Sequence, residues 1–445
     1  MNDETKTNAD DGTQRAESAK DAVHDTAHDA AHDAAHDAAP AGAPDVNVKL
    51  LAFLLAACSM IGPFATDMYL PSFHEMMAEF GVGLEAVQQT LTSYLIGFAV
   101  MTLFYGTISD LIGRKPTMVG GFVLFALSSL GAALSSSLEA LIVFRALEGV
   151  FAGCGMVVGM AVIRDLYGGP QAQKLMAYVA MVFGFGPALA PIIGGYLAVH
   201  AGWQSHFWVL TAISFALALM CLFFLPESLP KDQRTPIDLK VLARGYWHCS
   251  KHAPFMLGNI ALGLAFLGQG VFIAGAADWC VNVVGLAADE FWMLFIPMVS
   301  GTVVGSWVST QLAVRVGTTG SIRIGFFVMI AASLASTALI VFSVKAAMPW
   351  AVIPLCIYTV GIGIIRPGMS LVLMDCFPQS RGMASSVLSF IQTLLFALCS
   401  AVVVPMLYGS GLKYEAAIIT FAVITILFWV MGGYLRLRRG SCHWK

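Results

Sequence analysis

The sequence predicts an all-α membrane protein in which twelve transmembrane helices form two bundles of six. Of the 445 residues, 58% are hydrophobic and only 11% are charged, whereas a soluble domain carries about 25% charged residues. Stretches without any charged residue recur along the chain, and several are long enough to cross a bilayer, which takes about 20 apolar residues. The basic residues fall mainly on alternate loops between these stretches. This composition argues against a soluble enzyme, a nucleic-acid-binding protein and a disordered scaffold.

An acidic tail, residues 1–47, precedes the first apolar stretch. It holds 11 acidic and three basic residues and contains no Leu, Ile or Phe, so it lacks the apolar surface that would offset the entropy of ordering. We expect the tail to be disordered. Its His-Asp repeat has the i, i+4 spacing of a helical metal site, at His24, His28, His32 and His36. The interleaved carboxylates favour the alternative, a solvated low-complexity segment, and we predict neither a metal site nor a cofactor.

The apolar stretches give the predicted spans in order. They cover 50–70, 86–109, 116–138, 139–162, two spans within 175–226 that separate near Gly202, 253–277, 291–314, 324–344, 350–373, 382–412 and 416–435. The first begins far from the acidic N-terminus, so we interpret it as a retained span and not as a signal peptide. Residues 227–252 form the long polar stretch between spans. They act as a predicted cytoplasmic linker between an N-terminal bundle, 48–226, and a C-terminal bundle, 253–440.

The distribution of Lys and Arg predicts the orientation. With the tail in the cytoplasm, 20 of the 24 basic residues lie in the tail or in cytoplasmic loops, and two lie in the opposite loops. The remaining two, Arg145 and Arg366, fall within spans. Basic residues accumulate on the cytoplasmic side of membrane proteins. We therefore expect both termini to be cytoplasmic.

The loop after the second span reads G-x-x-x-D-x-x-G-R-K, with Gly106, Asp110, Gly113, Arg114 and Lys115 at the fixed positions. The first glycine allows close helix packing, and the second can adopt a positive φ in a tight turn. The acid can meet a helix N-terminus or a nearby Arg. The alternative is a basic cytoplasmic turn that happens to hold one acid.

This string and the six-plus-six layout over 48–440 resemble the major facilitator superfamily, in which the string is the loop between helices 2 and 3. The resemblance implies the major facilitator fold, in which two six-helix bundles rock about a central pathway. It also implies that the loop latches the cytoplasmic side. The family often has a basic residue directly after the acid, whereas this chain has Leu111.

The fourth span contains Arg145 and Glu148, which share a helix face at i, i+3. Each charge at membrane depth costs about 2.5–3.5 kcal/mol unless it is paired or faces water. A structural ion pair is one interpretation. The stretch also resembles the family's R-x-x-Q-G motif, whose Arg is tied to proton coupling. Glu148 stands where Gln is usual, so it either adds a second protonatable site or neutralises Arg145.

The fifth span contains Gly186, Pro187, Pro191, Gly194 and Gly195 in the pattern G-P-x-x-x-P-x-x-G-G. Glycines at this spacing let helices approach closely, and the prolines favour a kink. Ordinary close packing is the alternative. The string resembles the antiporter motif of the superfamily, and this resemblance implies proton-driven export.

Asp67 ends the first span, one turn before Pro71. We interpret it as a protonatable acid facing a central cavity, where loss of water favours the protonated form; the alternative is an interfacial acid at a fraying helix end. The string T-D-M-Y-L-P from Thr66 resembles the helix-1 signature of the bicyclomycin-resistance (Bcr/CflA) drug–proton antiporters, as does R-D-L-Y from Arg164. Arg366 precedes Pro367 in the tenth span, and both cavity-facing function and structural pairing remain open for it.

The leading functional hypothesis is a proton-coupled multidrug exporter of lipophilic, neutral or weakly cationic small molecules. Asp67, Arg145, Glu148 and Arg366 are its predicted coupling and cavity residues. The chain has no G-x-x-x-x-G-K-[ST] phosphate loop, so we do not expect ATP to be the direct energy source. Expected partners are a small-molecule substrate, protons and the lipid bilayer, with no nucleic acid, and we expect a monomer. The family resemblance implies a bacterial inner membrane.

Three alternatives compete with this hypothesis. A proton-coupled metabolite transporter for a nucleoside, sugar or amino acid would need a cavity richer in Asn, Gln and Arg. A membrane-embedded enzyme would need clustered His, Asp or Glu within the spans, such as H-E-x-x-H, and the spans contain no such cluster. The charge pattern is also compatible with a sensor or receptor without flux, and a transport measurement decides between them.

Overall fold

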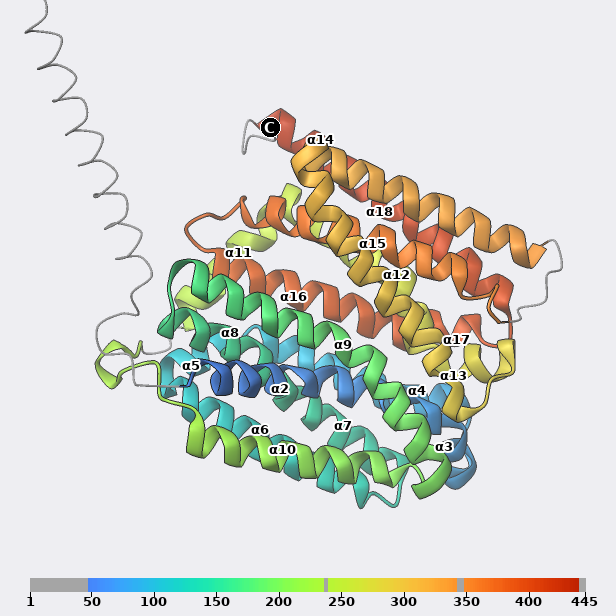
Figure 1. Ribbon diagram of the computed structural model, residues 1–445, viewed down its shortest axis with the longest axis horizontal. Helices are drawn as coiled ribbons and strands as arrows, with labels where there is room; N and C mark the ends of the chain where they lie inside the picture. Colours follow the sequence, from blue (N-terminus) through green and yellow to red (C-terminus); the bar gives the residue numbers. More distant parts are fainter. Residues whose placement is uncertain (1–46, 236–238, 342–347, 440–445) are drawn as a thin grey trace, which may run out of the picture.

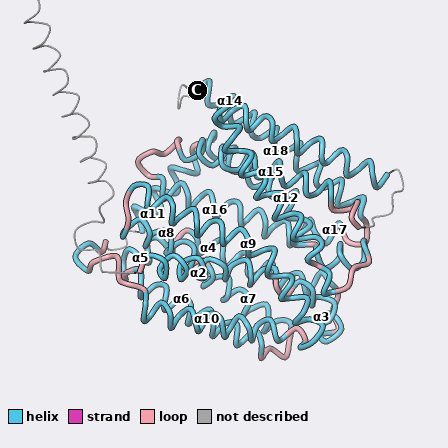
Figure 2. Tube along the Cα trace, in the orientation of Figure 1, coloured by secondary structure: helices cyan, strands magenta, loops and turns pink. Residues whose placement is uncertain are grey.

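The structure, a computed structural model, describes residues 47–235, 239–341 and 348–439. The regular elements in these ranges are helices (Figures 1 and 2). The predicted disordered tail, with its His-Asp repeat, lies outside the described residues. In Figure 1 the blue-to-green helices of the first half lie side by side below the yellow-to-red helices of the second half.

The described part of the first half contains nine α-helices. They are α2 (Val48–Asp67), α3 (Phe73–Phe80), α4 (Leu84–Thr102), α5 (Tyr105–Ile112), α6 (Arg114–Ala133), α7 (Leu138–Ala152), α8 (Cys154–Leu166), α9 (Gly169–Ala201) and α10 (Gln204–Phe224), with the 3-10 turn η1 (Leu70–Ser72) after α2. Asn47 caps α2, because its side chain accepts from the backbone N–H groups of Lys49 and Leu50. Two spans consist of helix pairs: α7 continues into α8, and α4 meets α5 at a bend of 54°.

The second half begins with a helix of the linker and continues with longer helices. The elements are the 3-10 turn η2 (Lys231–Gln233), α11 (Leu239–Lys251), α12 (Ala253–Ala274), α13 (Ala276–Asp278), the π-helix η3 (Trp279–Val284), the 3-10 turn η4 (Ala288–Glu290), α14 (Trp292–Val341), α15 (Ile353–Met374), α16 (Arg381–Leu398), the π-helix η5 (Cys399–Val403), α17 (Val404–Leu407) and α18 (Gly411–Arg439). The 50 residues of α14 are interrupted at Gly317, whose φ of 73° and ψ of 169° are not helical.

The span count agrees with the predicted fold class. Among the described residues, ten helices are long and apolar enough to cross a membrane, and the bent pair α4–α5 adds an eleventh. One of the ten, Ala288–Leu339, has 52 residues and contains the break at Gly317. Since one span takes about 20 residues, this stretch accounts for two, which gives the predicted twelve.

The linker touches both halves at the predicted cytoplasmic end. The Tyr246 hydroxyl of α11 donates to the carbonyl of Leu103 over 2.5 Å, at the bend between α4 and α5. On the neighbouring position of α11, Gly245 lies against the side chain of Met383 in α16. The limits of the two bundles, 48–226 and 253–440, remain predictions.

Candidate functional site

A buried ion pair lies in the middle of the first bundle. The Arg145 guanidinium on α7 donates to a carboxylate oxygen of Glu148, and both side chains are 0% exposed. The Ser129 hydroxyl on α6 donates to the other oxygen of that carboxylate. A further Arg145 N–H donates to the carbonyl of Ala65 on α2 over 2.9 Å. The i, i+3 spacing therefore produces the predicted pair, and the pair joins three helices.

Two tyrosines enclose the guanidinium of Arg145. Its central carbon lies 4.4 Å from the ring centre of Tyr69 and 4.5 Å from that of Tyr94, and Phe207 is 5.7 Å away. Cations are attracted to aromatic faces at these distances, and more strongly where water is excluded. The Tyr69 hydroxyl is itself held by Thr90 at 3.1 Å. We call Arg145, Glu148, Ser129, Tyr69 and Tyr94 the Arg145 cluster.

Asp67 lies beside this cluster on the last turn of α2. It is 3% exposed, and it stands two residues after Ala65, whose carbonyl accepts from Arg145. Within the described ranges Asp67 makes no ion pair. The structure thus brings three of the four predicted coupling residues to one region of the first bundle.

Arg366 lies apart from them, in the second bundle. It is an exposed residue in the middle of α15. Asp375, at the end of the same helix, pairs with Arg381 at 3.3 Å.

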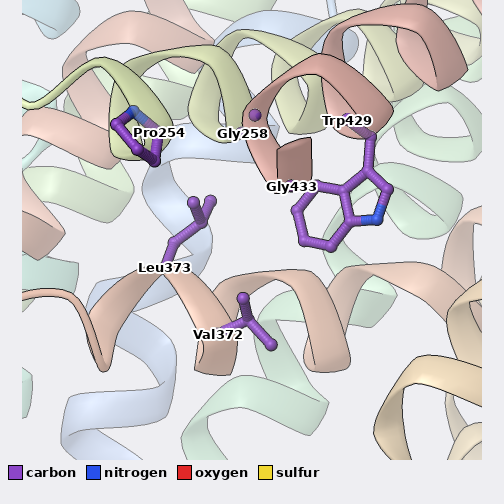
Figure 3. Close-up of a pocket in the computed structure, with 7 residues that line it drawn as sticks. Pro254, Gly258, Val372, Leu373, Trp429 and Gly433 are labelled. Atoms are coloured by element: carbon purple, nitrogen blue, oxygen red, sulfur yellow. The ribbon is translucent and has the colours of Figure 1, made fainter. Parts of the chain in front are cut away.

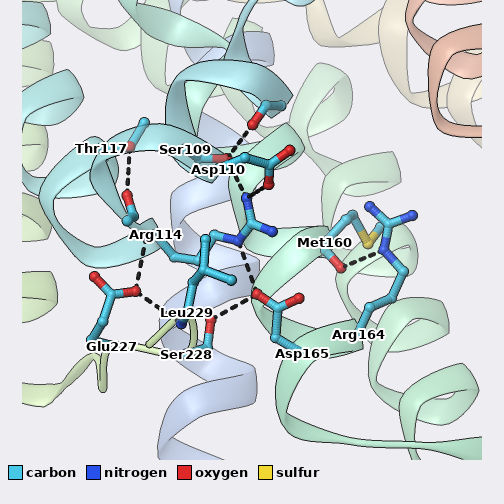
Figure 4. A network of polar contacts seen from close by, with 12 residues as sticks. Ser109, Asp110, Arg114, Thr117, Met160, Arg164, Asp165, Glu227, Ser228 and Leu229 are labelled. Atoms are coloured by element: carbon cyan, nitrogen blue, oxygen red, sulfur yellow. Dashed lines mark hydrogen bonds and ion pairs between the residues drawn. The ribbon is translucent and has the colours of Figure 1, made fainter. Parts of the chain in front are cut away.

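Arg114 organises the predicted gating loop (Figure 4). Its guanidinium donates to Asp110 over 2.5 Å, to Ser109 over 2.6 Å and to Asp165, at the end of α8, over 2.8 Å. Gly113 has a φ of 105°, as its position in a tight turn predicts. Asp110 is therefore paired with Arg114, four residues later. The acid has a basic partner even though position 111, which is often basic in the family, is Leu in this chain.

The start of the linker closes over this loop. Glu227 accepts from the backbone N–H of Arg114 over 2.9 Å and from Arg234 over 3.3 Å. The Ser228 hydroxyl donates to Asp165 over 3.0 Å (Figure 4). The loop, the end of α8 and the linker thus form one charged network at the predicted cytoplasmic end.

Two other residues of the loop add less to this network. The expected close packing at Gly106 is absent, because a Cβ there would meet no atom within 4 Å. Lys115 is half-buried, next to Arg114.

The glycines of the predicted antiporter motif are positions of close approach. A Cβ on Gly186 would lie 2.7 Å from Pro63, and one on Gly195 would lie 2.6 Å from the carbonyl oxygen of Ala288 in the other half. A Cβ on Gly194 would overlap the carbonyl oxygen of Met68. The helix α9 continues through both prolines, Pro187 and Pro191. The motif therefore packs α9 against the end of α2 and, on the neighbouring position, against the second half.

Polar contacts that the sequence did not predict join the two halves at the predicted outer end. Gln88 of α4 donates to the Ser400 hydroxyl over 2.8 Å and accepts from the Tyr408 hydroxyl over 3.1 Å. Thr92, one turn further along α4, shares a 3.1 Å hydrogen bond with Ser400. The i, i+4 spacing of Gln88 and Thr92 was the available indication in the sequence. We call Gln88, Thr92, Ser400 and Tyr408 the outer contact.

Three other buried titratable side chains were also not predicted to be in the site. His206 is bonded to the Ser72 hydroxyl at 2.7 Å. Asp278 accepts from Asn282, Tyr414 and the backbone of Gly409, so it holds the outer end of the second bundle together. Glu415 is 2% exposed, and one of its carboxylate oxygens has no hydrogen-bond partner.

Metal ligands and one small pocket were also compared with the predicted site residues in the described part of the chain. Among those residues, no three His, Cys, Asp or Glu side chains are placed to hold a metal ion. A small pocket between α12, α15 and α18 is lined by apolar residues (Figure 3), namely Pro254, Gly258, Val372, Leu373, Trp429, Gly432 and Gly433. It contains none of the predicted site residues.

Comparison with known proteins identifies the family. Residues 55–400 match the Major Facilitator Superfamily model. A bicyclomycin resistance protein homolog of Haemophilus influenzae is 31% identical over 270 residues, which is 61% of this chain and 68% of the relative. The multidrug transporter MdfA of Escherichia coli O6:H1 is 27% identical, covering 78% of this chain and 85% of its own.

Solved structures show the same fold. A D-xylose–proton symporter superposes with a TM-score of 0.68 at 16% identity, over 86% of this chain and 98% of the symporter. These relatives are transporters and not enzymes. The chain belongs to the major facilitator superfamily, as a multi-pass membrane transporter that resembles the bicyclomycin-resistance branch.

Proposed function

We propose that the protein is a drug–proton antiporter, which exports lipophilic, neutral or weakly cationic small molecules by alternating access. In this proposal it lies in the bacterial inner membrane as a monomer with both termini in the cytoplasm. The relatives named for bicyclomycin resistance and multidrug transport support the substrate class. The antiporter motif in α9 supports the direction, and the Arg145 cluster beside Asp67 supports the coupling.

The observation that carries the proposal is the charge balance around Arg145. Arg145 and Glu148 cancel each other, so an ionised Asp67 leaves the region with one net negative charge. An uncompensated charge is costly away from water, and one proton on Asp67 removes it. Protonation therefore changes the free energy of burying this end of α2, and the change can bias the rocking of the two bundles.

The membrane potential supplies the driving force. A proton that moves inward releases about 2.3 kcal/mol of free energy per 100 mV. This free energy can drive a substrate outward if proton and substrate bind alternately. Competition between proton and substrate for one conformational equilibrium is sufficient for the coupling. Asp67 needs no direct contact with the substrate in this scheme.

The polar contacts at the two ends of the molecule have different roles in the proposed rocking motion. The outer contact joins α4 to the helices around Ser400, and breaking it is a requirement for opening outward. The network around Arg114 holds the loop, α8 and the linker of the first half together. We propose that it keeps the first bundle rigid when the cytoplasmic side opens and closes.

The experiment that tests this function is dye transport in proteoliposomes under an imposed pH gradient, measured as accumulation of the dye. Wild type is expected to accumulate the dye against its gradient only while the proton gradient persists. Asp67→Asn is expected to lose accumulation and to retain exchange of dye down its own gradient, because the cavity remains. Asp232→Asn, an exposed acid of the linker, is the matched control and is expected to behave as wild type.

Two outcomes contradict the proposal. Undiminished transport by the wild type after both the pH difference and the voltage have been collapsed excludes proton coupling. Normal accumulation by Asp67→Asn at every pH excludes Asp67 as the coupling acid.

A further inference from the structure

Arg366 is exposed on a side of α15 that is otherwise buried. The positions one turn to either side, Ile362 and Met369, are 2% and 0% exposed. The helix also has an exposed apolar face, which carries Ile357 and Leu371. At 3.6 residues per turn, the centre of this face is about 160° from Arg366 around the helix axis. Lipid contacts that apolar face. Arg366 therefore opens onto space inside the protein.

The direction of the side chain does not favour escape to the membrane surface. Arg366 is eight residues before the end of α15 at Met374, which places it about 12 Å from that end. Side chains on a helix tilt toward its N-terminus, and the N-terminus of α15 is at the predicted outer end. The guanidinium thus points toward the middle of the membrane.

No acidic side chain compensates Arg366. Within the described ranges it has no ion pair and no hydrogen bond, and Asp375 is paired with Arg381. An Arg at this depth is costly without a partner or water. The guanidinium offers five N–H donors in a planar fork, and this geometry matches a carboxylate.

The depth of Arg366 can be fixed from helix packing. Leu373 of α15 lies against Gly258 of α12 (Figure 3), and the Tyr358 hydroxyl donates to the carbonyl of Ala265. Since the two helices run in opposite directions, Arg366 is level with the α12 residues between Gly258 and Ala265.

A second donor lies at about this depth. Gly263 of α12 packs against Gln392 of α16, and the buried amide nitrogen of Gln392 has no hydrogen-bond partner. Buried polar atoms are normally satisfied. An N–H donor without a partner among the described residues, at about the depth of an unpaired guanidinium, points to an acceptor that is not part of the chain.

We propose that Arg366, assisted by the amide of Gln392, is an anion-accepting subsite of the transport pathway, and that favoured substrates carry one acidic group such as a carboxylate. The inference rests on the proposed function and deepens it. Asp67 and Glu148 in the first bundle are buried, and Glu148 is paired with Arg145. Of the four predicted cavity residues, the exposed one is Arg366, which is positively charged. A zwitterion with a carboxylate and a weak base fits both parts of the proposal.

The test compares one fluoroquinolone, norfloxacin, with its methyl ester, in which an uncharged ester replaces the carboxylate. Binding to purified protein in nanodiscs is followed by drug fluorescence, with ethidium as a cationic control. Wild type is expected to bind norfloxacin at least about tenfold more tightly than the ester, the range of a charge-assisted hydrogen bond. Arg366→Gln is expected to abolish that preference, because the group that pairs with the carboxylate is removed.

Three further variants make the result specific. Arg366→Lys keeps the charge without the planar fork and is expected to retain part of the preference. Gln392→Leu is expected to weaken norfloxacin binding alone. Arg323→Gln, an exposed Arg of α14, is the matched control and is expected to have no effect.

The inference is overturned if norfloxacin and its ester bind wild type equally, or if Arg366→Gln weakens both to the same extent. If Arg366→Gln does not fold, the same comparison on Arg366→Lys and Gln392→Leu decides. Proton-driven ethidium efflux by wild type is measured in parallel. If wild type exports ethidium but shows no preference for the carboxylate, only the anion subsite is rejected. If wild type does not export ethidium, the proposed antiport is rejected.

Discussion

The intramembrane arginines of the two bundles differ in burial and in pairing. Arg145 in the first bundle is fully buried, paired with Glu148 and enclosed by two tyrosines. Arg366 in the second bundle is exposed and has no partner among the described residues. Because the fold repeats six spans twice, this difference is not imposed by the architecture. In the roles proposed above, the first bundle holds its charges in balance, and the second offers a charge to a ligand.

The largest expected effect comes from breaking the balance in the first bundle. Arg145→Met leaves Glu148 buried without its partner, and removal of one member of a buried ion pair costs about 3–5 kcal/mol. We expect a lower melting temperature and a poor yield of folded protein. Thermal unfolding in detergent, followed by the monodisperse fraction on size-exclusion chromatography, measures this.

The double variant Arg145→Met with Glu148→Met sharpens the same comparison. Replacement of both charges by apolar side chains is often neutral, so stability is expected to recover while proton-driven transport does not. If the double variant stays as unstable as the single one, packing around Arg145 and not its charge determines stability.

The second prediction concerns the approach of α9 to α2. Gly194→Ala places a Cβ on the carbonyl oxygen of Met68, and overpacking of this kind costs about 1–3 kcal/mol. We expect a strong loss of transport in the dye-efflux assay. Gly184→Ala, on the same helix and with no atom within 4 Å, is the matched control. Equal activity of the two variants would refute a packing role for the motif.

A smaller effect is expected at the predicted cytoplasmic end. Arg114→Gln loses the bonds to Asp110, which is 44% exposed, and to Asp165, which is 22% exposed. Pairs that water reaches on one side contribute less than buried ones, on the order of 1 kcal/mol. We expect a reduced transport rate at nearly unchanged stability. Lys115→Gln, which removes one charge at the next position, serves for comparison, and a larger defect in that variant would contradict the network.

The smallest prediction concerns the outer contact. Gln88→Leu removes neutral hydrogen bonds between the bundles, each contributing about 1 kcal/mol, which corresponds to about a fivefold change in a conformational equilibrium. We expect a shift toward outward opening, measured as faster thiol labelling of a cysteine placed near Ser400. Gln89→Leu, whose side chain bonds within its own helix to the carbonyl of Glu85, is expected to label as wild type does.

Much of the fold was predictable because each span is long and apolar, and the loops between spans carry basic residues. The pairing of Arg145 with Glu148 followed from their spacing, and the positive φ of Gly113 followed from the turn motif. Local patterns of this kind involve only neighbours along one helix or one turn.

Contacts between distant segments were not predictable from one sequence. The position of Tyr69 over Arg145 depends on where η1 turns the chain after α2, and the outer contact depends on how α4 is rotated toward Ser400. The same limit explains Gly106, which was expected to lie against another helix and faces open space. The linker residue Glu227, which holds the gating loop, has no local pattern that would connect it with Arg114.

The short helix α11 has a mechanical consequence. Tyr246 holds it to the bend of one bundle while Gly245 lies against the other, so it is a tether across the mouth of the pathway. A movement that separates the two halves at this end must either break the hydrogen bond between Tyr246 and Leu103 or move α11 together with the first half. We expect that shortening the peptide around α11 would limit how far the two halves can separate at the predicted cytoplasmic end.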